Sequence, residues 1–131
     1  MDLYLENYNF GIEEENKKKE CLEKFFNCEL THKIDNRYSL YDYKSKCKSI
    51  YIEIKSRRNE KLKYETTMIG YNKIKFFYEK FKKNKKVYIV FNFTDCICYY
   101  EVKEIKKEYI QMFKRTKYYF IPTKELINIE N

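Results

Sequence analysis

The residues that decide the fold are Ser39–Arg58, which read SLYDYKSKCKSIYIEIKSRR. The side chains of a β-strand point alternately to its two faces, so the isoleucines at every second position predict a strand over Ile50–Lys55. On this strand Glu53 and Lys55 share the face opposite the isoleucines, with their Cα atoms about 7 Å apart. The strand therefore carries two charges side by side on one face.

A second strand pattern lies at Tyr38–Tyr43, and the turn-prone residues SKCKS separate it from the strand that follows. Two strands joined by a short polar turn predict a β-hairpin. Ten residues lie between Asp42 and Glu53, and folding the hairpin can bring the two carboxylates opposite each other. Paired carboxylates can hold a hard divalent cation through oxygen. The sequence therefore predicts that Asp42, Glu53 and Lys55 converge on one point.

These residues resemble the PD-(D/E)XK nuclease superfamily, which includes restriction endonucleases, Holliday junction resolvases of the archaeal type and many viral and phage nucleases. Asp42 and Glu53-Ile54-Lys55 carry the resemblance, while Tyr41 replaces the proline of the signature. The resemblance implies that Asp42, Glu53 and the carbonyl of Ile54 bind Mg²⁺, for which Mn²⁺ can substitute. It also implies that Lys55 positions or activates the attacking water.

The same stretch has a second interpretation that needs no site. The chain is 37% charged, so an acid followed at a distance by Glu-x-Lys arises often by chance. Alternating Glu and Lys on the outer face of a hairpin are then ordinary cross-strand ion pairs in contact with water. This interpretation predicts a solvated outer face for Glu53 and Lys55.

A further acid is predicted on a charged helix over Ile12–Asn27. Glu15 falls on the same helical stripe as Leu22 and therefore points toward the body of the fold. Gly11 and Glu15 match a Gly-x-x-x-Glu pattern found in members that resemble archaeal resolvases, and this resemblance implies that Glu15 lies near the metal. Acids in a first helical turn also suit the helix dipole, so the position alone does not decide the role.

Three basic residues are predicted to bind phosphates. Arg57 and Arg58 directly follow the strand and can grip phosphate oxygens. Lys73 falls in the first turn of a helix predicted over Tyr71–Lys83, where backbone N–H groups and a cation together favour an anion. The segment around Lys73 resembles that of some viral members, whose helix lysine or glutamine completes the site. Solvated surface cations are the alternative for all three.

The composition indicates one soluble globular domain. Hydrophobic residues make up 44% of 131 residues, with two glycines and one proline, so mostly regular elements are expected. The net charge of +8 favours a polyanionic partner, although a genome of low G+C content also enriches lysine. No run is long enough to cross a bilayer.

The cysteines indicate an intracellular protein, in the cytoplasm or at a replication site in a host cell. Their number is odd, no zinc-site spacing is present and no signal peptide precedes them, so reduced thiols are expected. Cys96 and Cys98 are predicted to place both sulfurs on one strand face, as packing rather than chemistry.

The hydrophobic pattern predicts an α/β fold. Val87–Phe93 is the most apolar strand and is expected at the centre of the sheet. The other predicted strands are Leu30–Ile34, Tyr38–Tyr43, Ile50–Lys55, Ile97–Val102 and Tyr118–Ile121, with short helical segments at Glu108–Lys114 and Thr123–Ile129. The order of elements matches the restriction-endonuclease-like α-β-β-β-α-β core, a mixed sheet of four to five strands flanked by helices. One domain over residues 1–131 is expected, with the core at about 10–102 and a C-terminal tail at 103–131.

The hypothesis that follows is a Mg²⁺-dependent deoxyribonuclease, more an endonuclease than an exonuclease, with no small-molecule cofactor. Contacts to phosphates alone predict structure-selective or nonspecific cutting, in viral, phage or microbial DNA replication, recombination or repair. A junction resolvase would act as a homodimer. Two alternatives remain open: a non-catalytic nucleic-acid-binding or assembly module of the same fold, and an unrelated small α/β interaction protein.

Overall fold

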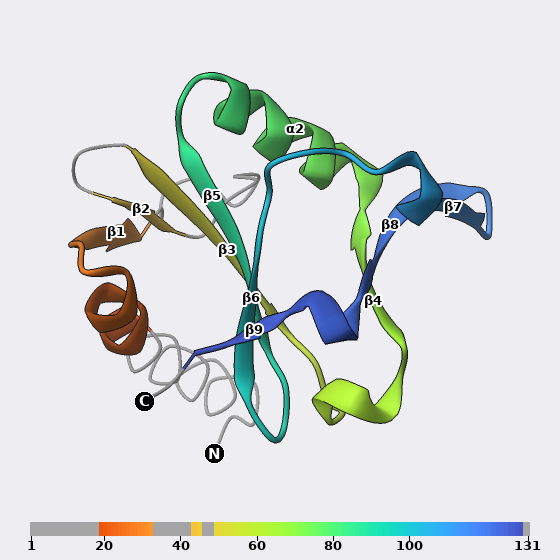
Figure 1. The fold of residues 1–131 in the computed structure, drawn as a ribbon, viewed down its shortest axis with the longest axis horizontal. Coiled ribbons are helices and arrows are strands. Elements are labelled where there is room, and N and C mark those ends of the chain that lie inside the picture. The colour runs from red at the N-terminus through yellow and green to blue at the C-terminus, as the bar shows by residue number, and fades with distance from the viewer. Residues whose placement is uncertain (1–18, 33–42, 46–48, 130–131) are drawn as a thin grey trace, which may run out of the picture.

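The computed structural model describes residues 19–32, 43–45 and 49–129. Within these residues the strands form one sheet of six strands and one of three. Residues 19–26 are helical, and a second helix, α2, spans Tyr71–Lys82. The two sheets and α2 surround a common core, while residues 19–26 lie at the opposite end of the molecule from the small sheet (Figure 1). The predicted mixed α/β class is confirmed.

The large sheet is mixed. Its strand order is β1-β2-β3-β5-β6-β9, and its strands are β1 (Leu30–His32), β2 (Tyr43–Ser45), β3 (Ile50–Ser56), β5 (Lys86–Asn92), β6 (Ile97–Glu101) and β9 (Ile127–Asn128). Strands β3 and β5 run parallel, and the other neighbours run antiparallel. Parallel neighbours need a crossover connection, and the chain between them contains α2. The sheet exceeds the expected four to five strands because β9 adds a sixth.

Strand β5 is central, as its apolar sequence predicts. Val87, Ile89 and Phe91 are buried in the cluster beneath α2, and Val90 is buried in the cluster on the other face. Burial on both faces is what a near-continuous apolar run requires.

The two faces of β3 differ as the alternation predicts. Ile50, Ile52 and Ile54 pack with Leu22 of the helical residues 19–26. Tyr51, on the other face, belongs to the cluster beneath α2, which includes Ile74 and Phe77 of that helix. Glu53 and Lys55 have the same alternation as Tyr51, so they belong to the α2 side.

The hairpin of β2 and β3 has a shorter turn than expected. Ser45, which the sequence analysis placed in the turn, belongs to β2 and is buried. Its Oγ accepts hydrogen bonds from the backbone N–H groups of Ser49 and Ile50 at 3.1 and 3.0 Å. A serine that bonds to the backbone across a turn stabilises the turn. Residues 38–42 of the predicted strand lie outside the described residues.

The three-stranded sheet is the main departure from expectation. Its order is β4-β8-β7, with β4 at Thr66–Gly70, β8 at Thr116–Pro122 and β7 at Ile110–Phe113. The helix expected over Glu108–Lys114 is wrong, because β7 pairs with β8 after a short 3₁₀ turn at Lys107–Tyr109. Strand β4 was not predicted, although Thr67 and Ile69 alternate inward and are buried. Residues after Val102 thus form part of both sheets.

The segment Thr123–Ile129 is helical only in its first turn. Thr123–Glu125 forms a 3₁₀ turn and β9 follows. Thr123 was expected to cap the turn, but its hydroxyl lies near the carbonyls of Tyr64 and Glu65, at 3.0 and 3.1 Å. The hydroxyl therefore ties this turn to the start of β4.

None of the helices among the described residues is long and apolar enough to cross a membrane.

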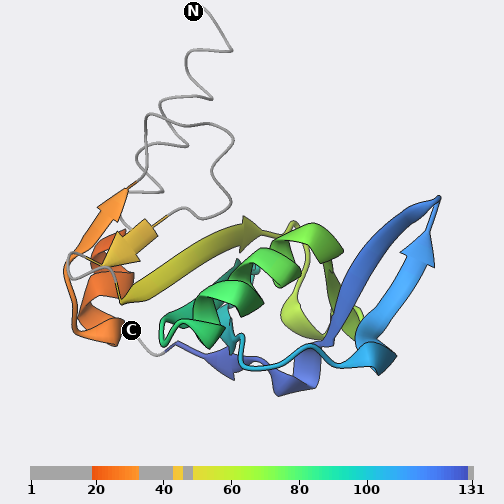
Figure 2. The same ribbon diagram turned by 90° about the horizontal axis from the view of Figure 1, so that it is seen from above.

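The β7–β8 hairpin projects from the body of the fold (Figure 2). Its two-residue turn consists of Lys114 and Arg115, with φ angles of 49° and 67°. Two consecutive left-handed residues match a type I′ turn, in which Asn-Gly is the preferred pair.

The double variant Lys114→Asn/Arg115→Gly is expected to raise the free energy of unfolding by about 1 kcal/mol, because side chains other than Asn and Gly are strained in this conformation. Urea denaturation measures the change. The matched variant Lys114→Ala/Arg115→Ala removes the same charges and should give no gain. Equal stability of the two variants would contradict the assigned turn.

Candidate functional site

Glu53 is a buried carboxylate in the middle of β3. Its residue is 3% exposed, and β3 lies between β2 and β5 in the sheet. Glu53 is in register with Ile89 of β5, on the face that α2 covers. A solvated outer face, the alternative interpretation of this stretch, does not describe Glu53.

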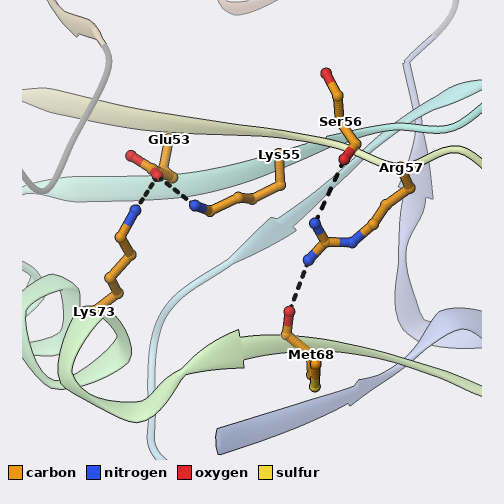
Figure 3. A network of polar contacts seen from close by, with 6 residues as sticks. All are labelled: Glu53, Lys55, Ser56, Arg57, Met68 and Lys73. Carbon is orange, nitrogen blue, oxygen red and sulfur yellow. Dashed lines mark hydrogen bonds and ion pairs between the residues drawn. The ribbon is translucent and has the colours of Figure 1, made fainter.

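Two lysines meet at one oxygen of this carboxylate. The Nζ of Lys55 lies 3.2 Å from Oε1 of Glu53, and the Nζ of Lys73 lies 2.6 Å from the same atom. Lys55 comes from the same strand, whereas Lys73 reaches down from the first turn of α2 (Figure 3). The lysine side chains are 29% and 28% exposed, so the buried carboxylate is connected to the surface through its two ammonium partners.

In this cluster Lys55 loses its proton more easily than an ordinary lysine does. Burial lowers the pKa of Lys55, and its contact with Lys73 lowers it further, while Glu53 partly offsets both effects. Two cations and one carboxylate leave the cluster with a net positive charge. This local potential attracts an anion such as a phosphate.

The position of Lys73 follows from local structure. Strand β4 ends at Gly70, and α2 begins at once with Tyr71. No side chain caps this helix end, and a Cβ at Gly70 would meet no atom within 4 Å among the described residues. The first turn of α2 therefore offers its N–H groups next to the Lys73 side chain.

The structure brings together three of the predicted site residues, Glu53, Lys55 and Lys73. The side chain of Ile54 packs in the opposite core, so only the backbone of this residue could contribute to a site at Glu53. Arg58 is exposed. Asp42 and Glu15 lie outside the described residues.

The described hairpin register agrees with the predicted pairing as far as it extends. Tyr43 pairs with Ile52, and Lys44 pairs with Tyr51. Asp42 and Glu53 are the next residues in sequence beyond the pair of Tyr43 and Ile52. The expected meeting of Asp42 and Glu53 stays a prediction.

The guanidinium of Arg57 bonds to β4 (Figure 3). Its Nη2 donates a hydrogen bond to the carbonyl of Met68 at 2.7 Å, and its Nε donates to Oγ1 of Thr67 at 3.1 Å. The guanidinium also lies 5.5 Å from the ring centroid of Phe91. Because β4 was not predicted, these partners could not be inferred from the sequence. These contacts link β3 to the small sheet.

Glu53 is the carboxylate of this cluster that could bind a divalent cation. Across the described ranges 19–32, 43–45 and 49–129, no group of three His, Cys, Asp or Glu side chains could hold a metal ion. Mg²⁺, however, is commonly held by one or two carboxylates and keeps several waters. A glutamate carboxylate is the kind of oxygen ligand that Mg²⁺ uses. Glu53 therefore fits the role of one ligand.

The thiols are not candidates for this chemistry. The sulfurs of Cys96 and Cys98 lie 3.5 Å apart, which confirms that they share one side of the strand. Burial raises the pKa of Cys96 to about 12, with contributions from Cys98 and Asp95. A thiol with so high a pKa is a weak nucleophile and a weak metal ligand at neutral pH.

Comparison with protein-family models and with curated proteins finds no match to this sequence. The function of this chain is therefore inferred from its residues and their geometry.

Replacing Glu53 alone is expected to destabilise the protein. Glu53→Met leaves two partly buried ammonium groups close together without this carboxylate, at a cost of roughly 1–3 kcal/mol after allowance for their exposure. The triple variant Glu53→Met/Lys55→Met/Lys73→Met should recover or exceed the wild-type stability, because apolar side chains suit this face. Urea denaturation of both variants measures this. A triple variant less stable than Glu53→Met would show that the cluster stabilises the fold.

Replacing Arg57 is expected to loosen the small sheet. Arg57→Met retains much of the apolar stem but removes the bonds to β4, and should lower the free energy of unfolding by about 2 kcal/mol. Arg58→Met is the matched control, because this exposed neighbour has the same charge. Equal effects of the two substitutions on stability would contradict the assigned role of Arg57.

Proposed function

We propose that this chain is a metal-dependent nuclease that hydrolyses DNA phosphodiester bonds. One observation carries the proposal: a buried glutamate on a strand meets the lysine two residues later and a second lysine at the start of a helix. The Glu53-Ile54-Lys55 sequence at this point is that of the PD-(D/E)XK motif. A helix between the parallel strands β3 and β5 of a mixed sheet supports the proposal, since the superfamily core also has a helix before its last strand. Strand β4, between β3 and α2, is an addition to that order.

The burial of Glu53 argues for a site. A buried charge costs free energy even when it is paired, and apolar residues of similar size are often as stable or more stable. Titratable groups arranged in this way cluster at functional sites. In the surrounding cluster, residues such as Tyr51, Ile89 and Phe91 are apolar, so the fold itself has no need of a carboxylate here.

The proposed ligands of Mg²⁺ are Glu53, the carbonyl of Ile54 and Asp42, the last from the sequence alone. A bound Mg²⁺ supplies Lewis acidity that stabilises charge on the scissile phosphate and lowers the pKa of a coordinated water. Glu15 is a further proposed ligand on the same sequence basis.

The two lysines have different proposed roles. Lys55, whose pKa is lowered, orients the attacking water and favours the loss of its proton. Lys73 and the open first turn of α2 hold a phosphate oxygen, because N–H groups and a cation converge there. Both lysine side chains are partly exposed, so a DNA backbone can reach them. Arg58, on the surface beyond β3, is proposed to contact the backbone further along, whereas Arg57 has its main contacts within the protein.

A second function is favoured by one observation. Among the described residues, Glu53 belongs to no group of three acidic, histidine or cysteine side chains that could enclose a metal. A non-catalytic nucleic-acid-binding module of the same fold would need only the positive potential of Lys55 and Lys73.

The test is cleavage of supercoiled, single-stranded and four-way-junction DNA with Mg²⁺ or Mn²⁺. Glu53→Gln and Lys55→Met should each reduce the rate at least about 100-fold, because each removes a group that acts on metal or water. Glu79→Gln is the matched control, since Glu79 is an exposed glutamate paired with Lys82 on α2. Its rate should equal that of the wild type.

The outcomes separate the two functions. Metal-dependent cutting that is lost in Glu53→Gln and Lys55→Met and kept in Glu79→Gln supports the nuclease. Absence of cutting by the wild type, together with salt-sensitive DNA binding that Lys73→Met weakens, would replace the nuclease with the binding module.

A further inference from the structure

The outer face of the three-stranded sheet carries a row of aromatic side chains. Phe113, Tyr118 and Phe120, here called the aromatic ladder, alternate with Tyr119 and Ile121, which are fully buried. The ring centroids of Phe113 and Tyr118 lie 6.4 Å apart, as do those of Tyr118 and Phe120. Phe113 is 49% exposed. The ladder therefore offers ring faces and edges to solvent from β7 and β8.

Basic residues lie at the hairpin tip, next to the Phe113 end of the ladder. The turn residues Lys114 and Arg115 directly follow Phe113. Lys117, which lies opposite Met112, alternates with Tyr118 and therefore lies on the other face of the hairpin. Between Tyr109 and Lys124 the sequence contains three basic residues and no acidic residue. The hairpin surface is thus both aromatic and positively charged, which is the combination that single-stranded nucleic acids bind through bases and phosphates.

The same hairpin leads toward the candidate site. The Nζ of Lys117 lies 4.7 Å from the ring centroid of Tyr71, the first residue of α2. Lys73, which contacts Glu53, belongs to the same helical turn. Strand β8 also pairs through Tyr118 with Gly70, the residue before α2. Lys117 therefore places a positive charge beside the start of α2, on the opposite face of the hairpin from the ladder.

The backbone conformation of the hairpin turn supports a function for the charges of Lys114 and Arg115. Lys114 and Arg115 adopt left-handed φ angles, although Asn and Gly fit such a turn with less strain. Residues held in strained conformations cluster at functional sites. The structure therefore keeps two cations at the tip at a cost in conformational energy.

We propose that the outer face of the three-stranded sheet binds single-stranded DNA, with bases stacked on the aromatic ladder and phosphates on Lys114 and Arg115. Unpaired bases are required, because in a duplex the base faces are already stacked. The choice of DNA over RNA rests on the proposed nuclease function. The surface would make single-stranded or branched DNA the preferred substrate class of the Glu53 site.

A second copy of this chain is the competing occupant. Strand β7 is an edge strand and could pair with another edge. Pairing of two copies along β7 would, however, place two hairpins of net positive charge next to each other, and charged edges oppose such pairing. Charge complementarity therefore favours a polyanion.

The experiment is fluorescence anisotropy of a labelled 15-nucleotide oligo(dT) in EDTA, where no cleavage occurs, at several salt concentrations. Phe113→Ala should weaken binding at least about fivefold, the low end for loss of one stacked base, without changing the salt dependence. Phe113→Tyr should bind like the wild type. Lys114→Asn/Arg115→Gly, which keeps the turn, should reduce the slope of log K against log salt by about 1.4, or about 0.7 for each lost phosphate contact.

The control variant changes an aromatic residue far from the three-stranded sheet. Phe25→Ala removes an exposed phenylalanine from helical residues 19–26, at the far end of the molecule, and should leave binding unchanged. Tighter binding of a matched 15-base-pair duplex or of oligo(U) would overturn the proposal. So would a dimer in sedimentation velocity that Phe113→Ala dissociates.

The inference and the nuclease can fail separately. A protein that binds oligo(dT) through the ladder but cuts no DNA keeps the inference and loses the nuclease. A protein that cuts DNA, while Phe113→Ala changes neither binding nor cutting, keeps the nuclease and loses the inference.

Discussion

The placement of the Glu53 carboxylate on an otherwise apolar sheet face is the constraint around which this structure is arranged. A buried carboxylate is costly unless cations meet it, and here Lys55 and Lys73 both lie within 3.2 Å of Oε1. Strand β3 supplies one cation and α2 the other. The ion pair between Glu53 and Lys73 thus fixes the start of α2 over the strand, and β4 leads directly into that helix turn.

The elements that could be predicted from the sequence are those whose hydrophobic pattern fits only one type of secondary structure. The apolar run Val87–Phe93 could only be a covered strand, and β5 is central. The alternation in Ile50–Lys55 assigned both faces of β3 correctly, because a period of two leaves no other choice. Helix α2 ends within one residue of its expected end. For the candidate site, Glu-x-Lys spacing was enough to place Glu53 and Lys55 on one face, and the helix crossover was enough to bring Lys73 near.

The remaining features depend on contacts distant in sequence. Thr66–Gly70 alternates weakly, with only Thr67 and Ile69 pointing inward, and it forms because β8 pairs with it about fifty residues later. The segment Glu108–Lys114 has residues compatible with a helix, and pairing with β8 overrides that propensity. Arg57 was expected at a phosphate, but β4 supplies carbonyl and hydroxyl acceptors for its guanidinium. The burial of Glu53 likewise needed the packing of α2, which no local pattern contains.

The most direct test of the central claim, that the Glu53 carboxylate binds a divalent cation, is isothermal titration calorimetry with Mn²⁺ in the absence of DNA. The account predicts saturable binding by the wild type, its loss in Glu53→Gln and its retention in Glu79→Gln. Binding does not depend on any substrate, so it tests the site apart from its activity. Equal binding by the wild type and Glu53→Gln, or no binding by a folded wild type, would contradict the account.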